Sequence, residues 1–205
     1  SLMRVDQKNH LNLYNTVFNI IQKIQKLGDS ALIEFVNKFD SKKINKIEEL
    51  YVAKDVLKNA YHSLKKEEKQ ALNIAAERIK KFHTHQIPID IKYKDNMNVN
   101  LGLRHSPIDS AGFYVPGGKA IYPSSVLMNA IPAFVAGVER RVVVSPVSDL
   151  HKSSIVLAAA YVANATEFIC MGGAHAVAAL AYGTETVMYV DKIVGPGNAY
   201  VAEAK

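Results

Sequence analysis

The chain has 205 residues, of which 49% are apolar, 21% charged and 8% aromatic, and it contains a single cysteine. This composition is too apolar for intrinsic disorder, and its longest apolar run, residues 155–163, is shorter than the roughly 20 residues of a membrane-spanning helix. One cysteine excludes an internal disulfide framework, and the opening residues show no stretch typical of a signal peptide, so we expect a cytoplasmic protein.

The net charge of +6 is unevenly distributed. Residues 105–205 contain six Lys/Arg and seven Asp/Glu, so residues 1–104 hold the other 19 basic and 12 acidic residues and a net charge of +7. Most lysines of the first part alternate with apolar positions of predicted helices, which is typical of a solvated helix face. A nucleic-acid surface is the alternative, but neither interleaved aromatic residues nor a docking motif supports it.

Apolar residues spaced three and four apart predict helices in the first part of the chain. We expect helices over 13–27, from residue 29 or 30 to 39, and over 54–64 and 67–85, with Gly28 ending the first and a polar loop around a short extended piece over 42–49. His83 and His85 are two positions apart on a predicted helix, where side chains point about 200° apart, so this pair is a poor metal site.

Alternation replaces the helical period after Pro88, which breaks the preceding helix. Apolar residues at 89, 91 and 93, and again at 99, 101 and 103, alternate with other residues on either side of a turn at Asp95-Asn96. We therefore expect a β-hairpin with one face buried.

Strands and helices alternate through the rest of the chain. We expect strands over 111–115, 141–144, 167–171 and within 186–194, and helices over 123–136, 153–164, 175–182 and 198–205. This order predicts a parallel sheet covered on both faces, and the Val/Ile-rich runs indicate strands buried on both sides.

Ten of the eleven glycines follow residue 101, and several stand in the predicted strand–helix turns, at 117–118, 172–173, and 195 and 197. Ligands of parallel sheets bind outside the carboxyl ends of the strands, and glycine lets a backbone N–H approach a ligand closely. The sequence therefore predicts a ligand site in these turns.

Known nucleotide motifs match these turns poorly. Gly195-Pro196-Gly197 has the first two glycines of a dinucleotide fingerprint, but Tyr200 stands at the third. Gly117-Gly118-Lys119 resembles the end of a phosphate-binding P-loop, but Ala120 replaces the required Ser or Thr. A nucleoside triphosphatase is therefore disfavoured.

Reactive side chains are few in this second part. Cys170 lies in an apolar strand and is interpreted as a buried small hydrophobe. His175 begins a helix beside a glycine pair, and the residues alone leave open whether it is structural or faces a ligand. Because no hydrolase or metalloprotease motif is present, the sequence indicates a binding site more clearly than a reacting one.

Three long segments of the second part resemble the histidinol dehydrogenase family. They are residues 112–118 (GFYVPGG), 172–185 (GGAHAVAALAYGTE) and 190–201 (VDKIVGPGNAYV), and shorter stretches at 28–32 and 38–40 also match. The resemblance covers nearly the whole chain. It implies an α/β fold: an incomplete Rossmann-like parallel sheet domain preceded by an amino-terminal helical segment and a β-hairpin.

The resemblance implies an NAD- and zinc-dependent oxidoreductase, homodimeric and cytoplasmic, that oxidises L-histidinol to L-histidine through the aldehyde with two NAD. Carried over by motif, the cofactor contacts would be Tyr114, Asn198 and His175, and the family usually has glutamine at the last of these positions. Imidazole can donate or accept one hydrogen bond there, but it lacks the paired donor and acceptor of an amide.

The resemblance places the zinc ligands, the acid/base pair and the histidinol-binding residues beyond Lys205, so we assign no catalytic or metal-binding residue. Residues 1–104 would belong to a domain completed by later sequence, and residues 105–205 would form a truncated NAD-binding domain. We expect the amino-terminal half of the family's chain, inactive by itself, with no nucleic-acid or membrane partner. The alternative is a stand-alone nucleotide-binding or regulatory module without catalysis.

Overall fold

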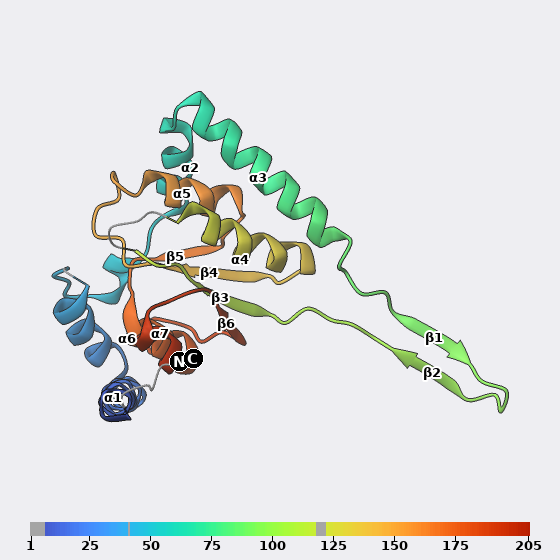
Figure 1. The fold of residues 1–205 in the computed structure, drawn as a ribbon, viewed down its shortest axis with the longest axis horizontal. Coiled ribbons are helices and arrows are strands. Elements are labelled where there is room, and N and C mark those ends of the chain that lie inside the picture. Colours follow the sequence, from blue (N-terminus) through green and yellow to red (C-terminus); the bar gives the residue numbers. More distant parts are fainter. Residues whose placement is uncertain (1–6, 41, 118–121) are drawn as a thin grey trace, which may run out of the picture.

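The computed structural model describes residues 7–40, 42–117 and 122–205, so Gly118, Lys119 and Ala120 of one glycine turn lie outside the described residues. A parallel four-stranded sheet lies at the centre, helices cover both of its faces, and a two-stranded arm projects away from it (Figure 1). This architecture confirms the predicted fold class, a Rossmann-like sheet domain after a helical segment and a hairpin.

A long bent helix, α1, opens the described chain and runs from Gln7 to Phe39. It leaves helical geometry at Gly28, whose φ is +52°, so two helices meet at the boundary that was predicted and share the label α1. Glycine tolerates this φ, and a Cβ at residue 28 would overlap the carboxylate of Glu185. The kink therefore requires glycine for two separate reasons.

The segment between α1 and the next helix is polar, as predicted, but it also contains a short helix that was not predicted. This is the 3-10 helix η1 (Ile47–Leu50), and the apolar side chains of Ile44, Ile47 and Leu50 are buried. The N–H of Cys170 donates to the carbonyl of Leu50 at 2.8 Å, which ties the segment to the edge of the sheet. The paired residues, 50–52, follow the loop predicted over 42–49, in which residues 43, 45, 46, 48 and 49 are exposed and only Ile44 and Ile47 are buried.

The four strands of the central sheet are parallel and lie in the order β5-β4-β3-β6. Their bounds are Ser110–Tyr114 for β3, Arg140–Val144 for β4, Glu167–Ile169 for β5 and Lys192–Val194 for β6. All five residues of β3 are buried, as expected for a strand covered on both faces.

Two layers of helices enclose the sheet (Figure 1). One contains α4 (Pro123–Ala136) and α5 (Ser154–Val162), against which α3 (Lys66–Thr84) and α2 (Lys54–Ser63) pack. The other contains α6 (Gly173–Tyr182) and α7 (Ala199–Ala204), against which α1 packs. None of the described helices is long and apolar enough to cross a bilayer.

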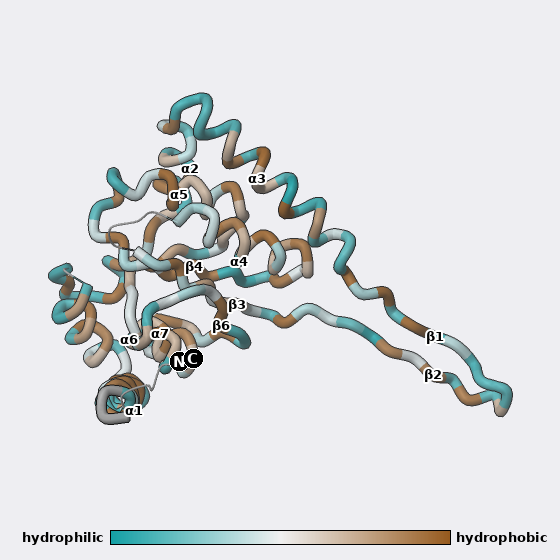
Figure 2. Tube along the Cα trace, viewed as in Figure 1, coloured by the Kyte–Doolittle hydropathy of each residue, from teal (hydrophilic) through white to brown (hydrophobic). Residues whose placement is uncertain are grey.

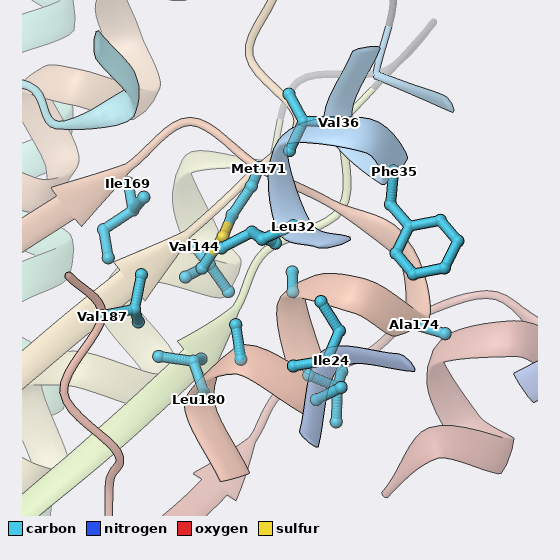
Figure 3. Packing of buried hydrophobic residues seen from close by; sticks show 14 of the residues in the cluster. Ile24, Leu32, Phe35, Val36, Val144, Ile169, Met171, Ala174, Leu180 and Val187 are labelled. Atoms are coloured by element: carbon cyan, nitrogen blue, oxygen red, sulfur yellow. The ribbon is translucent and has the colours of Figure 1, made fainter. Parts of the chain in front are cut away.

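Side chains of the strands alternate between two hydrophobic clusters. Phe113 and Val143 join the cluster beneath α4 and α5, whereas Val144 faces the cluster beneath α6. Figure 3 shows Leu32 and Ile24 of α1 packed among the side chains of this second cluster. The amino-terminal helix is thus part of the core that supports the sheet.

The predicted hairpin forms the arm, from β1 (Ile91–Lys94) and β2 (Asn100–Leu103), which pair antiparallel. Its position is confirmed, but the prediction that one face is buried is wrong, because every residue of both strands is exposed. The alternation of apolar and polar residues correctly marks which face of the hairpin carries the apolar side chains. That face stays exposed because the helices pack around the central sheet, away from the arm (Figure 2).

Candidate functional site

A pocket of about 520 Å³ opens at the carboxyl ends of the parallel strands, between α1, the turn after β3 and the beginnings of α6 and α7. Two other hollows, of about 610 and 580 Å³, lie beside residues 182–189 and at the base of the arm. Because parallel sheets bind ligands at their carboxyl edge, the first pocket is the candidate site. Its lining residues are Thr16, Ile20, Phe39, Asp40, Tyr114, Pro116, Gly117, Pro146, Gly173, Ala174, His175, Asn198 and Tyr200.

Tyr114, the last residue of β3, is one of three predicted cofactor contacts that line this pocket. Its side chain is largely buried, and its hydroxyl accepts the N–H of Gly173 at 3.0 Å. Burial raises the pKa of Tyr114 above its ordinary value, so the phenol stays protonated at neutral pH. A hydroxyl that accepts one hydrogen bond still has its proton to donate to a ligand.

His175, the second predicted contact, lies in the first turn of α6 with only 1% of its surface exposed. Its Nε2 is 3.0 Å from Oδ2 of Asp40, and its ring lies beside those of Phe35 and Phe39, with centroids 6.2 and 6.1 Å away. The ring is therefore held by the protein itself and also borders the pocket.

Asn198, the third predicted contact, precedes α7 and is exposed. Its Oδ1 accepts the N–H of Val201 at 3.1 Å, which satisfies one of the free backbone donors at the start of that helix. The cap uses the oxygen of the side-chain amide and leaves the amide nitrogen available to another partner.

The glycines of the turns make room for protein atoms. A Cβ at Gly172 or Gly117 would come within 2.6 or 2.8 Å of the ring of Pro146, and a Cβ at Gly195, whose φ is +118°, would overlap the carbonyl of Tyr114. The N–H groups of Gly172 and Gly173 donate to Asp40 and Tyr114. These glycines therefore let the turns converge, and these two amides are engaged by side chains of the pocket.

Asp40 is the pocket residue that sequence reasoning did not single out. It follows α1 directly, and its side chain is 6% exposed. Its two partners, Gly172 and His175, are 132 and 135 positions away in the sequence, so no local spacing connects them. Its position directly after an amphipathic helix and the family match at residues 38–40 were the available signals.

Two further interpretations concern residues outside the pocket. Cys170 is buried, and burial raises the pKa of its thiol, which agrees with a small core residue. His83 has its Nδ1 at 2.6 Å from Oε1 of Gln86. Within residues 7–40, 42–117 and 122–205, no group of three or more His, Cys, Asp or Glu side chains could hold a metal ion.

Comparison with known proteins gives one consistent result. The family model described as histidinol dehydrogenase matches residues 3–205. The chain is 49% identical over 189 residues to histidinol dehydrogenase of Neisseria meningitidis serogroup A, covering 92% of this chain and 44% of that protein. It is 45% identical over 204 residues to the Acinetobacter baylyi protein of the same name, covering 100% of this chain and 47% of the relative.

A solved structure shares the fold. The crystal structure of histidinol dehydrogenase from Elizabethkingia anophelis matches with a TM-score of 0.85 and 33% identity, covering 94% of this chain and 44% of that chain. The chain thus spans less than half the length of the relatives that it matches.

Proposed function

Because this chain belongs to the histidinol dehydrogenase family, we propose that it supplies the NAD-binding part of an oxidoreductase that converts L-histidinol to L-histidine. The observation that carries the proposal is the position of Tyr114, His175 and Asn198, which come from three strand–helix turns and line one pocket at the carboxyl edge of the sheet. This edge is where doubly wound sheets bind dinucleotides.

The pocket is suited to part of a nicotinamide dinucleotide. Its volume lies within the range of about 300–1,000 Å³ typical of small-molecule sites, and its wall combines apolar residues with polar side chains that can orient a ligand. Tyr114 offers a hydroxyl proton, Asn198 an amide nitrogen and His175 an imidazole ring. These groups would orient the cofactor, and NAD, when bound, accepts a hydride from carbon.

The overall conversion removes four electrons from the substrate. Oxidation of the alcohol to the aldehyde transfers one hydride and releases one proton, and oxidation of the hydrated aldehyde to the carboxylic acid transfers a second, so two NAD are consumed and one water is incorporated. In the proposed division, residues 105–205 supply Tyr114, His175 and Asn198 to the cofactor site and α1 completes one wall of the pocket. Residues 1–104 also contribute to a domain that further sequence of the family completes.

Zinc and proton transfer are proposed to reside in the part of the family's chain that this chain does not span. The described residues contain no group that fits a metal ion, so we derive no step through zinc and assign no base to His83 or His85. We further propose that the complete protein is a cytoplasmic homodimer.

Substitution at the pocket tests the cofactor assignment. In the intact protein, Tyr114→Phe and Asn198→Ala should raise the KM for NAD about threefold to tenfold, the effect of one lost hydrogen bond, and change the KM for histidinol less. Tyr51→Phe is the matched control, because its hydroxyl donates to the carbonyl of Thr186 away from the pocket. Equal effects on both substrates would show that Tyr114 and Asn198 are structural.

Activity of the isolated chain tests the division of labour. The 205-residue chain should produce no NADH from histidinol, and measurable production would overturn the assignment of the chemistry to other sequence. An intact protein that binds NAD without oxidising histidinol would instead support a stand-alone nucleotide-binding module. Binding of duplex DNA that falls steeply with salt would support the nucleic-acid alternative.

A further inference from the structure

A buried carboxylate links three parts of the pocket. Asp40 lies directly after α1, and its Oδ2 accepts the N–H of Gly172 at 2.9 Å and lies 3.0 Å from Nε2 of His175. Its side chain is 6% exposed and that of His175 is 1% exposed. Hydrogen bonds between groups so well shielded from water are costly to leave unmade, so this carboxylate restrains both the turn after β5 and the histidine ring.

The hydrogen-bond pattern assigns the proton on the histidine. A carboxylate has only acceptors, so Nε2 must carry the proton that it shares with Asp40. In the neutral ring, Nδ1 is then the acceptor. The Nδ1–Cε1 edge of the ring lies against Gly173, where an added Cβ would be 3.1 Å from both atoms, and Gly173 lines the pocket.

The ring has little freedom to turn. Phe35 and Phe39 lie beside it at centroid distances of 6.2 and 6.1 Å, and its Nδ1–Cε1 edge lies against Gly173. Flipping the ring would exchange Nε2 for a carbon and leave the buried carboxylate without this donor. The tautomer and the orientation of His175 therefore depend on one oxygen of Asp40.

Tyr114 complements this arrangement. Its hydroxyl accepts the next amide of the same turn, that of Gly173, and keeps its proton for a ligand. We propose that Asp40 is a positioning residue of the cofactor pocket: it holds the turn at Gly172 and fixes the ring of His175 in the wall of the pocket. This inference rests on the proposed cofactor site.

The experiment uses variants that separate the acceptor from the charge. Both partners of Asp40 meet the same oxygen, so Asp40→Asn can keep both contacts, whereas Asp40→Leu loses them. Asp29→Leu is the matched control, because Asp29 also lies on α1 and accepts hydrogen bonds from Thr186, away from the pocket. ¹⁵N NMR of labelled histidine reports the tautomer of His175, and NADH fluorescence reports affinity in the intact protein.

We expect the Nε2–H tautomer in the wild type, in Asp40→Asn and in Asp29→Leu, with affinities for NADH within about twofold of one another. Asp40→Leu should lose the single tautomer and bind NADH at least about tenfold more weakly. An unchanged tautomer in Asp40→Leu, or an equal loss of affinity in Asp29→Leu, would overturn the inference. If Asp40→Leu does not fold, Asp40→Ala takes its place, and an unchanged tautomer and affinity in that variant would overturn the inference.

The two proposals fail differently. A wild-type protein that does not bind NADH would refute the cofactor assignment, and the tautomer of His175 in the Asp40 variants would still decide whether this carboxylate positions the ring.

Discussion

The parallel sheet and the β1–β2 arm place similar apolar side chains in opposite environments. Phe113 and Val143, paired across the sheet, are 1% and 0% exposed, whereas Tyr93 and Leu101, paired across the arm, are 56% and 41% exposed. Helices lie on both faces of the sheet, and the arm projects beyond them (Figure 1). An apolar repeat thus identifies the face of an element that is suited to burial, but another element must pack against that face to bury it. A two-stranded hairpin without such packing is only marginally stable.

The largest expected effect is that of a charge in the sheet. Val143→Asp would bury a carboxylate without a partner between β3 and β5, which costs more than about 4 kcal/mol and should abolish cooperative folding. Far-UV circular dichroism with urea titration measures this. A variant with a native spectrum and an unchanged urea midpoint would show that the sheet is not the core of the chain.

A cavity beneath α1 should have an intermediate effect. Leu32 is fully buried in the cluster shared by α1 and α6 (Figure 3), so Leu32→Ala should lower the free energy of unfolding by about 3 kcal/mol. Leu11→Ala on the same helix is the control, because Leu11 is 58% exposed, and it should cost less than about 0.5 kcal/mol. Similar losses in the two variants would mean that α1 does not belong to the sheet's core.

A smaller effect is expected from acid. The Oδ2 atom of Asp191 accepts the N–H and the hydroxyl of Ser110 at 2.8 and 2.9 Å, and these hydrogen bonds hold the pKa of Asp191 below its ordinary value. Because the folded pKa is the lower one, ionisation favours the folded state at neutral pH. This contribution disappears as the pH falls through the folded-state pKa.

Asp191→Asn should therefore lower the urea midpoint at neutral pH and reduce its decline between about pH 6 and about pH 3. Urea titrations of both proteins at each pH measure this difference. Parallel declines would assign the acid sensitivity to other carboxylates.

The smallest effect is expected in the arm. Leu101→Asp, on the apolar face of the exposed hairpin, should change the free energy of unfolding of the 205-residue chain by no more than about 0.5 kcal/mol. The same change of residue type at Val143 is the contrasting variant. A loss of several kcal/mol at Leu101 would show that the arm contributes to folding of the sheet.

Local periodicity predicted nearly every element, because helices and strands bury side chains at characteristic spacings. The helix over 123–136 matches α4 at both ends, and the strand predicted over 141–144 differs from β4 by one residue. The short helix η1 at the end of the loop over 42–49 was not predicted, since the residues that follow it pair with the edge of the sheet, more than a hundred residues later.

The candidate site shows the same division. Tyr114, His175 and Asn198 stand beside glycine-rich turns that the sequence displays directly, and the structure brings all three to one pocket. Asp40 has no such marker, because its importance comes from two contacts across the fold. The glycines of these turns also allow the turns to pack closely on Pro146 and Tyr114, which their spacing along the sequence could not show.

Local patterns of side chains were enough to establish the order of the elements, the parallel sheet, the carboxyl-edge turns and the family resemblance. Long-range contacts place α1 in the core of the sheet, join Asp40 to His175 and leave the arm exposed. These features depend on which distant surfaces meet, and an amphipathic repeat defines its own apolar face without specifying the surface that will cover it.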